Sequence, residues 1–412
     1  MSKVLIVGGG AAGFMAAYSA ACCGAEVVIL ERNPRPLRKV MITGKGRCNV
    51  TNDTDLNGLI GAVTGNGRFL YSAFSNFTSS DTKAFFERQG VALKTERGNR
   101  VFPESDKAVD IVDALVRTAK EVGVTVLQER VTELVTDGSK VQGVKCESGN
   151  IHFGDSVIIA TGGMSYPLTG STGDGYSLAR QVGHTVTELS PSLVAVTCHE
   201  GWCSEAQGLS LKNISINVFK NGDKKAVFSD FGELMFAHYG LSGPVILSAS
   251  AYMPHVTENE YKIVIDLKPA LSHEKLDQRI LRDFEKNLNK DFINSLGELL
   301  PRKLIPVVVK LSGISPSAKI NQVTREQRMK LVEVLKGLTL TVTGFRPIEE
   351  AIVTKGGVKL SEVSPKTMES KLISGLYFAG EVLDLDAFTG GFNLQIAFST
   401  GFAAGEAAGS IY

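Results

Sequence analysis

Residues 3–32 read KVLIVGGGAAGFMAAYSAACCGAEVVILER, and this stretch decides the fold. The apolar run KVLIV predicts a buried strand, and the spacing Gly8-x-Gly10-x-x-Gly13 opens an alanine-rich segment that predicts a helix. A second apolar run follows and ends at Glu31. Strand, glycine turn, helix, strand and a final carboxylate, in this order, indicate a dinucleotide-binding Rossmann unit.

Each glycine of this turn has a physical task. Gly8 permits the tight turn, Gly10 lets the backbone approach a pyrophosphate, and Gly13 lets the helix pack closely on the strand. The free N–H groups and the partial positive charge at the helix N-terminus favour the pyrophosphate there. We expect Glu31 to accept hydrogen bonds from the ribose hydroxyls.

Composition limits the classes of partner. The chain has 412 residues, with 44 Lys and Arg against 43 Asp and Glu. This near-neutral balance gives no electrostatic case for nucleic acid or for an anionic membrane. No apolar run approaches the length of a membrane span, and the N-terminal run is too short for a signal peptide. We therefore expect a cytoplasmic protein with a small-molecule substrate, no nucleic-acid partner and no membrane partner.

The cysteines predict neither a disulfide framework nor a metal site. Six cysteines in a chain of this length are too few for a disulfide scaffold, and no two CxxC pairs occur. We therefore expect a reduced protein without a bound metal. Cys22 and Cys23 fall on the predicted helix, where small core-packing residues are the expected role.

Two later segments favour FAD as the resident cofactor. The predicted strand from Ser156 to Ala160 leads into Thr161 and Gly162, and LYFAGE, near the C-terminus, ends at Gly380 and Glu381. Glycines in both the first and the last segments suit a long, bent cofactor. The stretch TGGFNLQ then opens a final helix, whose N-terminus would stabilise the negative charge that develops on a reduced flavin. The residues expected at that terminus are Gly391, Phe392, Asn393 and Leu394.

A nicotinamide has no fingerprint of its own. No second GxGxxG follows a strand, so the sequence predicts no dedicated nicotinamide domain. NAD(P)H is then expected only as a transient electron donor at the flavin.

The segment RKVMITGKGRCNVTN follows the second strand, and we expect it to run beside the pyrophosphate toward the flavin. Lys39 and Arg47 could counter phosphate charge, Gly46 permits close backbone approach, and Asn49 can donate a hydrogen bond. Cys48 is either a redox thiol or a small residue that packs beneath the cofactor. Because no second cysteine follows four or five residues later, the packing role is favoured.

Several long motifs resemble one bacterial family. They are GKGRCNVTN, GNRVFPESDKA, ATGGMSYPLTGSTGDGYSLARQVGH, ELMFAHYGLSGPVIL, KGGVKL, PKTMESKLISGLYFAGEVLDLD and TGGFNLQIAFSTG. Over essentially its whole length the chain resembles the HI0933-like flavoproteins, which are NAD(P)/FAD-dependent oxidoreductases or aminoacetone oxidase family enzymes. The detail of the motifs is most similar to a clostridial branch that includes proposed C=C reductases of 3-oxo bile acids.

The resemblance implies an α/β fold. A Rossmann-like FAD-binding domain would carry a β-barrel-like insert and a small helical insert, and amphipathic patterns predict helices at 79–91 and 108–124. The expected parts are the FAD-binding domain at 1–190 and 354–412, the β-rich insert at 191–271 and 338–353, and the helical insert at 272–337.

Further residues complete the expected sites. Val131 lies where this type of fold presents a backbone group to adenine. The remaining residues expected at FAD are Ala11, Ala12, Arg32 and Asp386. The candidate catalytic residues are Tyr166, His238 and Tyr239, because histidine titrates near neutral pH and a tyrosine can donate to an enolate oxygen. A structural hydrogen bond is the alternative role for each.

The resulting functional hypothesis is an FAD-dependent oxidoreductase. The favoured reaction is NAD(P)H-linked reduction of an activated C=C bond, an enone, in a small or steroid-like substrate. Two alternatives stay open: a flavin oxidase of a small amino ketone such as aminoacetone, and a flavoprotein of electron transfer or of nucleotide or tRNA modification.

Overall fold

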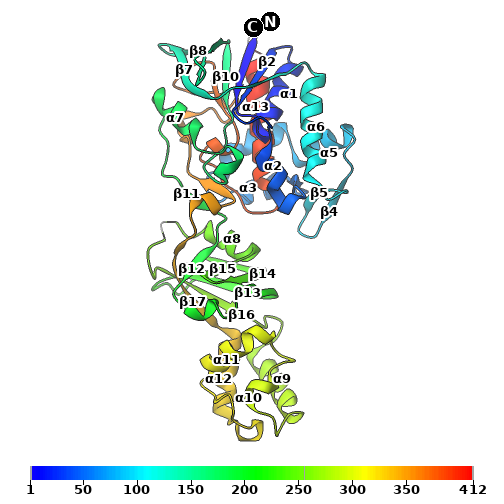
Figure 1. The fold of residues 1–412 in the computed structure, drawn as a ribbon, viewed down its shortest axis with the longest axis vertical. Helices are drawn as coiled ribbons and strands as arrows, with labels where there is room; N and C mark the ends of the chain where they lie inside the picture. The colour runs from blue at the N-terminus through cyan, green and yellow to red at the C-terminus, as the bar shows by residue number, and fades with distance from the viewer. Residues whose placement is uncertain (1, 255, 411–412) are drawn as a thin grey trace. The chain divides into compact units, whose positions relative to one another are not determined.

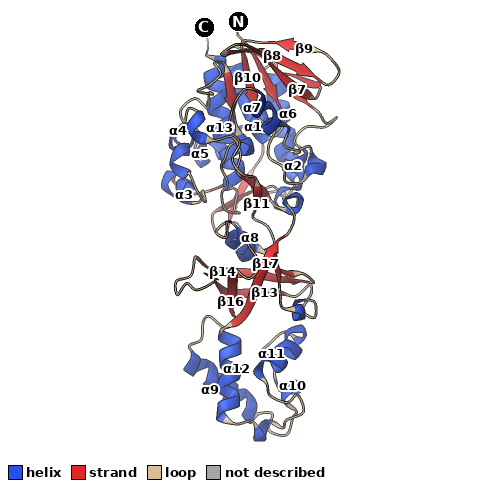
Figure 2. Ribbon diagram, turned by 90° about the vertical axis from the view of Figure 1, so that its left-hand side faces the viewer, coloured by secondary structure: helices blue, strands red, loops and turns tan. Residues whose placement is uncertain are grey.

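The chain divides into two units, each with its own hydrophobic core. A computed structural model describes residues 2–254 and 256–410 (Figures 1 and 2). The first unit comprises Met1–Ser192 and Pro347–Tyr412, and the second unit comprises Leu193–Arg346.

A five-stranded parallel sheet forms the centre of the first unit. Its strand order is β19-β10-β1-β2-β6. These strands are β1 (Lys3–Val7), β2 (Glu26–Glu31), β6 (Thr125–Gln128), β10 (Ser156–Ile159) and β19 (Leu376–Phe378). Parallel strands in the middle of such a sheet are buried on both faces, so they read as the continuous apolar runs seen in β1 and β10. The expected Rossmann-type α/β fold is confirmed.

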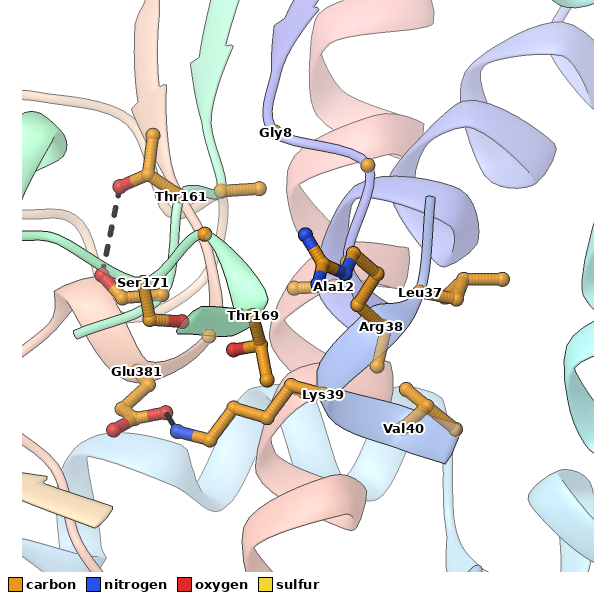
Figure 3. A pocket seen from close by; sticks show the side chains of 18 of the residues that line it. Gly8, Ala12, Leu37, Arg38, Lys39, Val40, Thr161, Thr169, Ser171 and Glu381 are labelled. Atoms are coloured by element: carbon orange, nitrogen blue, oxygen red, sulfur yellow. Dashed lines mark hydrogen bonds and ion pairs between the residues drawn. The ribbon is translucent and has the colours of Figure 1, made fainter. Parts of the chain in front are cut away.

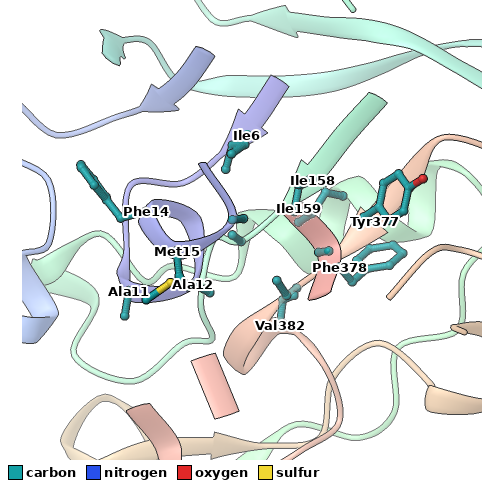
Figure 4. Packing of buried hydrophobic residues seen from close by; sticks show 14 of the residues in the cluster. Ile6, Ala11, Ala12, Phe14, Met15, Ile158, Ile159, Tyr377, Phe378 and Val382 are labelled. Atoms are coloured by element: carbon teal, nitrogen blue, oxygen red, sulfur yellow. The ribbon is translucent and has the colours of Figure 1, made fainter. Parts of the chain in front are cut away.

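Apolar side chains from the sheet and from the first helix share one core. Figure 4 shows Ile6 and Ile158, which are paired on adjacent strands, near Phe378 of β19. Phe14 and Met15 of α1 (Ala11–Cys22) belong to the same buried cluster. Apolar side chains cover both faces of the sheet. A polar ligand can therefore bind only at an edge of the sheet, such as the one where the strands end.

Two helices from opposite ends of the chain pack side by side. The last helix, α13 (Phe392–Gly409), lies against α1 (Figure 1). A Cβ atom added to Gly401 would lie 2.4 Å from the carbonyl oxygen of Ala12, and one added to Gly405 would lie 2.2 Å from that of Ala16. Only glycine lets the two backbones approach so closely. This contact fixes the C-terminal helix directly onto the dinucleotide-binding helix.

The rest of the first unit consists of small sheets and short helices. The sheets have the orders β3-β5-β4, β7-β8-β9 and β11-β18. Their strands are β3 (Thr51–Asn52), β4 (Leu93–Glu96), β5 (Arg100–Pro103), β7 (Val131–Asp137), β8 (Lys140–Cys146), β9 (Ile151–Phe153), β11 (Ser190–Ser192) and β18 (Val353–Lys355). The helices are α2 (Arg38–Ile42), α3 (Leu56–Gly61), α4 (Tyr71–Asn76), α5 (Ser79–Arg88), α6 (Ala108–Glu121) and α7 (Asp174–Gln181).

The second unit is a closed β-barrel with helices inserted between its strands. The barrel order is β12-β15-β14-β13-β16-β17, and β17 pairs with β12 to close it. Its strands are β12 (Val196–Cys198), β13 (Ser210–Lys220), β14 (Phe228–Ala237), β15 (Gly240–Ser242), β16 (Tyr261–Asp266) and β17 (Leu338–Phe345). Its helices are α8 (Pro244–Ser250), α9 (His273–Glu285), α10 (Phe292–Ser295), α11 (Ile305–Ser312) and α12 (Arg325–Lys336). The expected barrel insert is confirmed.

The six cysteines are all free thiols. Cys22 and Cys23, which were expected to pack in the core, are exposed instead. They lie at the C-terminal end of α1, where the chain turns toward β2, so the helix has already emerged from the core at these positions. Among the described helices, none is both long enough and apolar enough to cross a membrane.

Candidate functional site

A cleft opens at the carboxyl ends of the parallel strands of the first unit (Figure 3). Val7 of β1, Glu31 of β2, Ala160 after β10 and Ala379 after β19 all line it. Ligands of open parallel sheets bind at this edge, because the strand-to-helix turns there expose backbone groups. The cleft therefore lies where the sequence placed the cofactor.

The glycine turn between β1 and α1 forms one wall. Gly8 has φ +107° and donates its N–H to the carbonyl oxygen of Leu30 at 2.9 Å. A Cβ added to Gly13 would lie 2.0 Å from the carbonyl oxygen of Gly8, so only glycine fits there. Ala11 and the residue after it open α1 without a side-chain cap, and both line the cleft. Their backbone N–H groups have no partner inside the helix, which suits a pyrophosphate.

Glu31 is held rigidly at the end of β2. Its carboxylate is buried, one oxygen accepts the Gly9 N–H at 2.7 Å, and the other accepts the backbone N–H and the side-chain amide of Asn33 at 2.8 and 2.7 Å. Each carboxylate oxygen has further lone pairs, so hydroxyls of a ribose can still be accepted. Asn33 also lines the cleft and was missed from sequence, because its role depends on the turn that follows β2.

Two arginines converge on Asp174 beside this end of the cleft. Arg32 donates to Asp174 at 3.2 Å, and Arg130, just before β7, donates to it at 3.0 Å. Burial raises the pKa of Asp174, but the hydrogen bonds from Arg130 and Thr172 outweigh it, so the net pKa lies below the usual value. Arg32, Arg130 and Asp174 all line the cleft. Nothing in the sequence links Arg130 to Asp174, because 44 positions separate them.

A second polar network lies at the opposite part of the cleft. The Lys39 ammonium of α2 lies 2.6 Å from Glu381 Oε2 (Figure 3). It also donates to Ser165 Oγ at 2.7 Å. Glu381 Oε1 accepts hydrogen bonds from Ser165 Oγ at 3.0 Å and from the Thr354 N–H at 2.9 Å. Lys39 and Glu381 line the cleft, and their charges balance each other. Ser165 and Thr354 were missed from sequence. Ser165 lies within the motif ATGGMSYPLTGSTGDGYSLARQVGH, but only its contact with Glu381, 216 positions away, reveals its role.

The N-terminus of α13 supplies a further wall. Gly391 caps this helix with φ +98° and no side-chain cap, and Asn393 and Leu394 line the cleft. Asn393 shapes the preceding loop, because its amide oxygen accepts the Ala387 N–H at 3.0 Å and its amide nitrogen donates to the Ala387 carbonyl at 2.8 Å. The first N–H groups of the helix have no partner inside the helix, and two of the residues that carry them line the cleft.

Thr43 lines the cleft, but the segment GKGRCNVTN (44–52), which follows it, does not. The Arg47 guanidinium binds Glu96 and Asp106 and lies 4.1 Å above the Phe102 ring. Cys48 is fully buried, and burial raises the pKa of its thiol to about 12. Such a thiol remains protonated at neutral pH, which agrees with a packing residue rather than a redox thiol.

This segment instead supports the N-terminus of α13. The Asn52 amide donates to the carbonyl oxygens of Gly98 and Gly390, each at 3.0 Å. A Cβ added to Gly391 would lie 2.3 Å from the carbonyl oxygen of Thr51. The Thr51 hydroxyl donates to Gln395 of α13 at 2.6 Å.

The structure thus separates the expected cofactor residues into two groups. Those that line the cleft are Gly8, Gly10, Ala11, Ala12, Glu31, Arg32, Lys39, Val131, Thr161, Gly162, Gly380, Glu381, Asn393 and Leu394. Those outside its lining are Gly13, Gly46, Arg47, Cys48, Asn49, Asp386, Gly391 and Phe392. Gly13 and Gly391 still shape the wall, because each lets two backbone segments pack closely. Asp386 is buried and accepts a hydrogen bond from the Ser192 hydroxyl at 2.6 Å.

The three candidate catalytic residues lie in different units. Tyr166, in the first unit, follows Ser165 and has φ +52°; burial and then the charge of Glu350 raise the pKa of its phenol. His238 is exposed in the turn between β14 and β15 of the second unit. Tyr239 is half-buried, with the Arg346 guanidinium 4.6 Å from its ring centre.

Comparisons with known proteins agree with this architecture. A family model described as "HI0933-like protein Rossmann domain" matches residues 2–407. The chain is 30% identical to the 3-dehydro-bile acid delta(4,6)-reductase of Clostridium scindens, over 99% of each protein. It is also 30% identical to a ribosomal RNA dihydrouridine synthase of Escherichia coli, over 98% of this chain and 96% of that protein. The solved 3-ketosteroid delta1-dehydrogenase of Sterolibacterium denitrificans shares the fold, with TM-score 0.55, 12% identity, and coverage of 99% of this chain and all of that one.

Proposed function

The chain belongs to the HI0933-like family and is an FAD-dependent oxidoreductase, and from this premise we propose that it reduces a C=C bond conjugated with a carbonyl. The favoured substrate is a small, steroid-like enone, with NAD(P)H as the electron donor. The observation that carries this proposal is the match, over 99% of both chains, to a reductase named for 3-dehydro-bile acids.

The wall residues fit FAD. The uncapped α1 terminus and the Gly8 turn would hold the pyrophosphate, and the fixed Glu31 carboxylate would accept from the ribose. Bound FAD supplies the two-electron chemistry, and the protein has to position the substrate and manage protons. The free N–H groups of α13 would stabilise negative charge on the reduced cofactor, so they would favour its reduced state.

Protonation of the reduced substrate requires a donor. Tyr166 is our candidate in the first unit, because burial and Glu350 raise the pKa of its phenol and keep it protonated at neutral pH. His238 and Tyr239 remain candidates from the second unit. A Tyr166→Phe variant that still binds FAD and is still reduced by NAD(P)H, but transfers electrons slowly to the enone, is the expected signature of a donor.

The electron donor would share the substrate's site. A chain with one dinucleotide fingerprint uses it for FAD, so NAD(P)H would bind over the flavin and leave before the enone enters. We expect flavin bleaching when NADH or NADPH is mixed anaerobically with the protein, and recovery of colour on adding a 3-oxo-Δ4 steroid. Parallel double-reciprocal lines would support this order, and intersecting lines would contradict it.

A second candidate substrate is uridine in RNA. The Escherichia coli relative is named for dihydrouridine synthesis in ribosomal RNA, and adding two hydrogens to uracil also reduces a C=C bond conjugated with a carbonyl. Residues 272–337 contain 13 Lys and Arg against 8 Asp and Glu, although the whole chain is nearly neutral. Such a local excess of positive charge favours a polyanion.

One experiment separates the candidate substrates. The anaerobically reduced protein is offered a 3-oxo-Δ4 steroid or an unmodified ribosomal RNA transcript, and flavin reoxidation is followed. Reoxidation by the steroid supports the favoured function, and reoxidation by the transcript with dihydrouridine in its digest supports the second. Oxygen uptake with aminoacetone, without reaction with either acceptor, would identify an oxidase and overturn both.

A further inference from the structure

Three side chains that commonly bind metals meet beside the hairpin of β8 and β9. Glu129 follows β6, Cys146 ends β8, and His152 lies in the middle of β9. One carboxylate oxygen, the thiol sulfur and one ring nitrogen of these residues lie within 4.8 Å of one another. These three positions fit no CxxC spacing, so the sequence did not predict the group.

Strand register explains why the thiol and the imidazole share a face. β8 and β9 are antiparallel, and Val144 pairs with His152. Cys146 lies two residues after Val144, so its side chain points to the same face and is the diagonal neighbour of His152. The Cys146 N–H donates to the Asn150 carbonyl at 2.8 Å, which closes the turn between the strands.

The same turn orients the carboxylate. Ser148 Oγ donates to one oxygen of Glu129 and the Asn150 amide donates to the other, each at 2.7 Å. The Cys146 thiol also hydrogen-bonds this carboxylate. An ionised carboxylate has about four acceptor positions, so one position remains after these three bonds, and a second becomes free when the thiol loses its proton to bind a metal. Hydrogen bonds of this kind typically fix the carboxylate ligands of metal sites.

The imidazole is the unexplained member of the group. His152 Nε2 is buried, yet it has no hydrogen-bond partner among the described residues. The carboxylate oxygen of Glu129 lies 3.9 Å from it, beyond hydrogen-bonding distance. Buried polar atoms in native proteins nearly always have a partner, so an unpaired nitrogen aimed at a thiol and a carboxylate calls for an ion.

We propose that Glu129, Cys146 and His152 bind a divalent zinc-class cation, with water as the fourth ligand. Thiolate, imidazole and carboxylate are the ligand types that Zn²⁺ accepts, and its tetrahedral bonds of about 2.0–2.3 Å require only a small closure of the group. Mg²⁺ and Ca²⁺ are disfavoured, because they prefer oxygen ligands alone.

The site also adjoins the cofactor cleft. Glu129 itself lines the cleft, and its backbone N–H donates to the carbonyl oxygen of Glu31 at 3.0 Å. A cation bound to the Glu129 side chain would therefore fix the cleft wall next to the ribose-binding carboxylate. The role is structural, since nothing places these side chains at the reacting atoms.

Zinc content of the holoenzyme tests the proposal directly. The FAD-loaded protein is stripped with EDTA, dialysed to equilibrium against micromolar zinc chloride, and assayed for zinc by plasma mass spectrometry. We expect about one zinc per chain, and at least a tenfold loss of that zinc in Cys146→Ser and, separately, in His152→Ala. Cys22→Ser and His273→Ala are matched controls at exposed positions and should keep the zinc.

Folding is checked independently of metal. Thermal midpoints in EDTA should agree between the protein and each variant, and zinc should raise the midpoint only where the three side chains are intact. If Cys146→Ser fails to fold, His152→Ala and Glu129→Gln carry the test. No zinc in the native protein, or zinc unchanged in the folded variants, overturns the proposal.

Discussion

Two glycine-containing segments of the first unit contrast sharply. Residues 8–13 and residues 43–52 both contain glycines that permit close backbone approach to a ligand, and both were expected at the cofactor. The first segment forms the cleft wall, whereas the second leaves it after Thr43 and supports α13 from outside. A strand on one side and a helix on the other fix where a glycine turn lies, and a loop without that context goes where its long-range partners hold it.

The largest expected effect lies in the first segment. Gly13→Ala places a methyl group 2.0 Å from a backbone carbonyl oxygen, so α1 must move away from β1. We expect a loss of about 3 kcal/mol in the free energy of unfolding and poor FAD retention, measured by denaturant titration and flavin content. Gly46→Ala is the matched control in the second segment: it has positive φ but open space, so about 1 kcal/mol and full FAD content are expected. Equal losses of stability and of FAD content in the two variants would show that both segments contribute equally to the cofactor site.

The next effect concerns the charge at the end of β2. Glu31→Ala should weaken FAD binding by about 1–3 kcal/mol, because ribose hydroxyls and the Gly9 N–H lose a charged acceptor. Glu31→Gln separates the lost charge from the lost contact. Fluorescence titration of the apoprotein with FAD gives the affinity. Glu96→Ala, which removes a carboxylate from the Arg47 cluster, should leave the affinity unchanged. A comparable loss in that control would place the cofactor at both segments.

A smaller effect is expected for Arg47. In Arg47→Ala the guanidinium no longer lies over Phe102, so unfolding should become easier by about 1 kcal/mol. FAD affinity should stay within about twofold, since Arg47 lies outside the cleft lining. A loss of FAD affinity that is largest at low salt and shrinks at high salt would instead restore Arg47 as a phosphate ligand.

The smallest effect is expected at Cys48. Burial raises the pKa of its thiol to about 12, so in the native protein Cys48 should resist iodoacetamide at pH 8, while Cys22 and Cys23 react. Mass spectrometry of the peptides from one digest measures the extent of alkylation at each of the three cysteines. Cys48→Ser should keep most enone reduction. Lost turnover with FAD still bound would make Cys48 a participant in the reaction and change the role of the whole second segment.

The sequence-based predictions were most accurate where a local sequence pattern by itself determines the secondary structure. Periodicity and glycine spacing alone predict a strand, a turn, a helix and a second strand within residues 3–32. The structure has β1, the glycine turn, α1 and β2 in this order, and Figure 1 labels α1 and β2. The helices expected at 79–91 and 108–124 are α5 and α6, which end a few residues earlier because their last turns unwind at glycines. Fold class and cofactor class could therefore be predicted, whereas the barrel insert was expected from the family resemblance.

Contacts between residues that lie far apart in the sequence could not be predicted. Arg130 meets Asp174, and Lys39 meets Glu381 from 342 positions away. The proposed zinc ligands come from a loop and two strands, and their spacing matches no zinc motif. Such pairs carry no local signal, because each member is an ordinary polar residue in its own segment.

The sequence by itself determined that a dinucleotide turn exists, that it opens a helix, and that a carboxylate follows the second strand. The tertiary structure decided which other segments complete the cleft. Gly401 and Gly405 bring α13 onto α1, and only that contact places Asn393 and Leu394 in the wall. The physical reason is the distance in sequence over which each interaction acts. Helix hydrogen bonds and side-chain periodicity involve residues a few positions apart, so the local sequence reveals them. Close packing joins backbones that lie at opposite ends of the chain, so the local sequence does not.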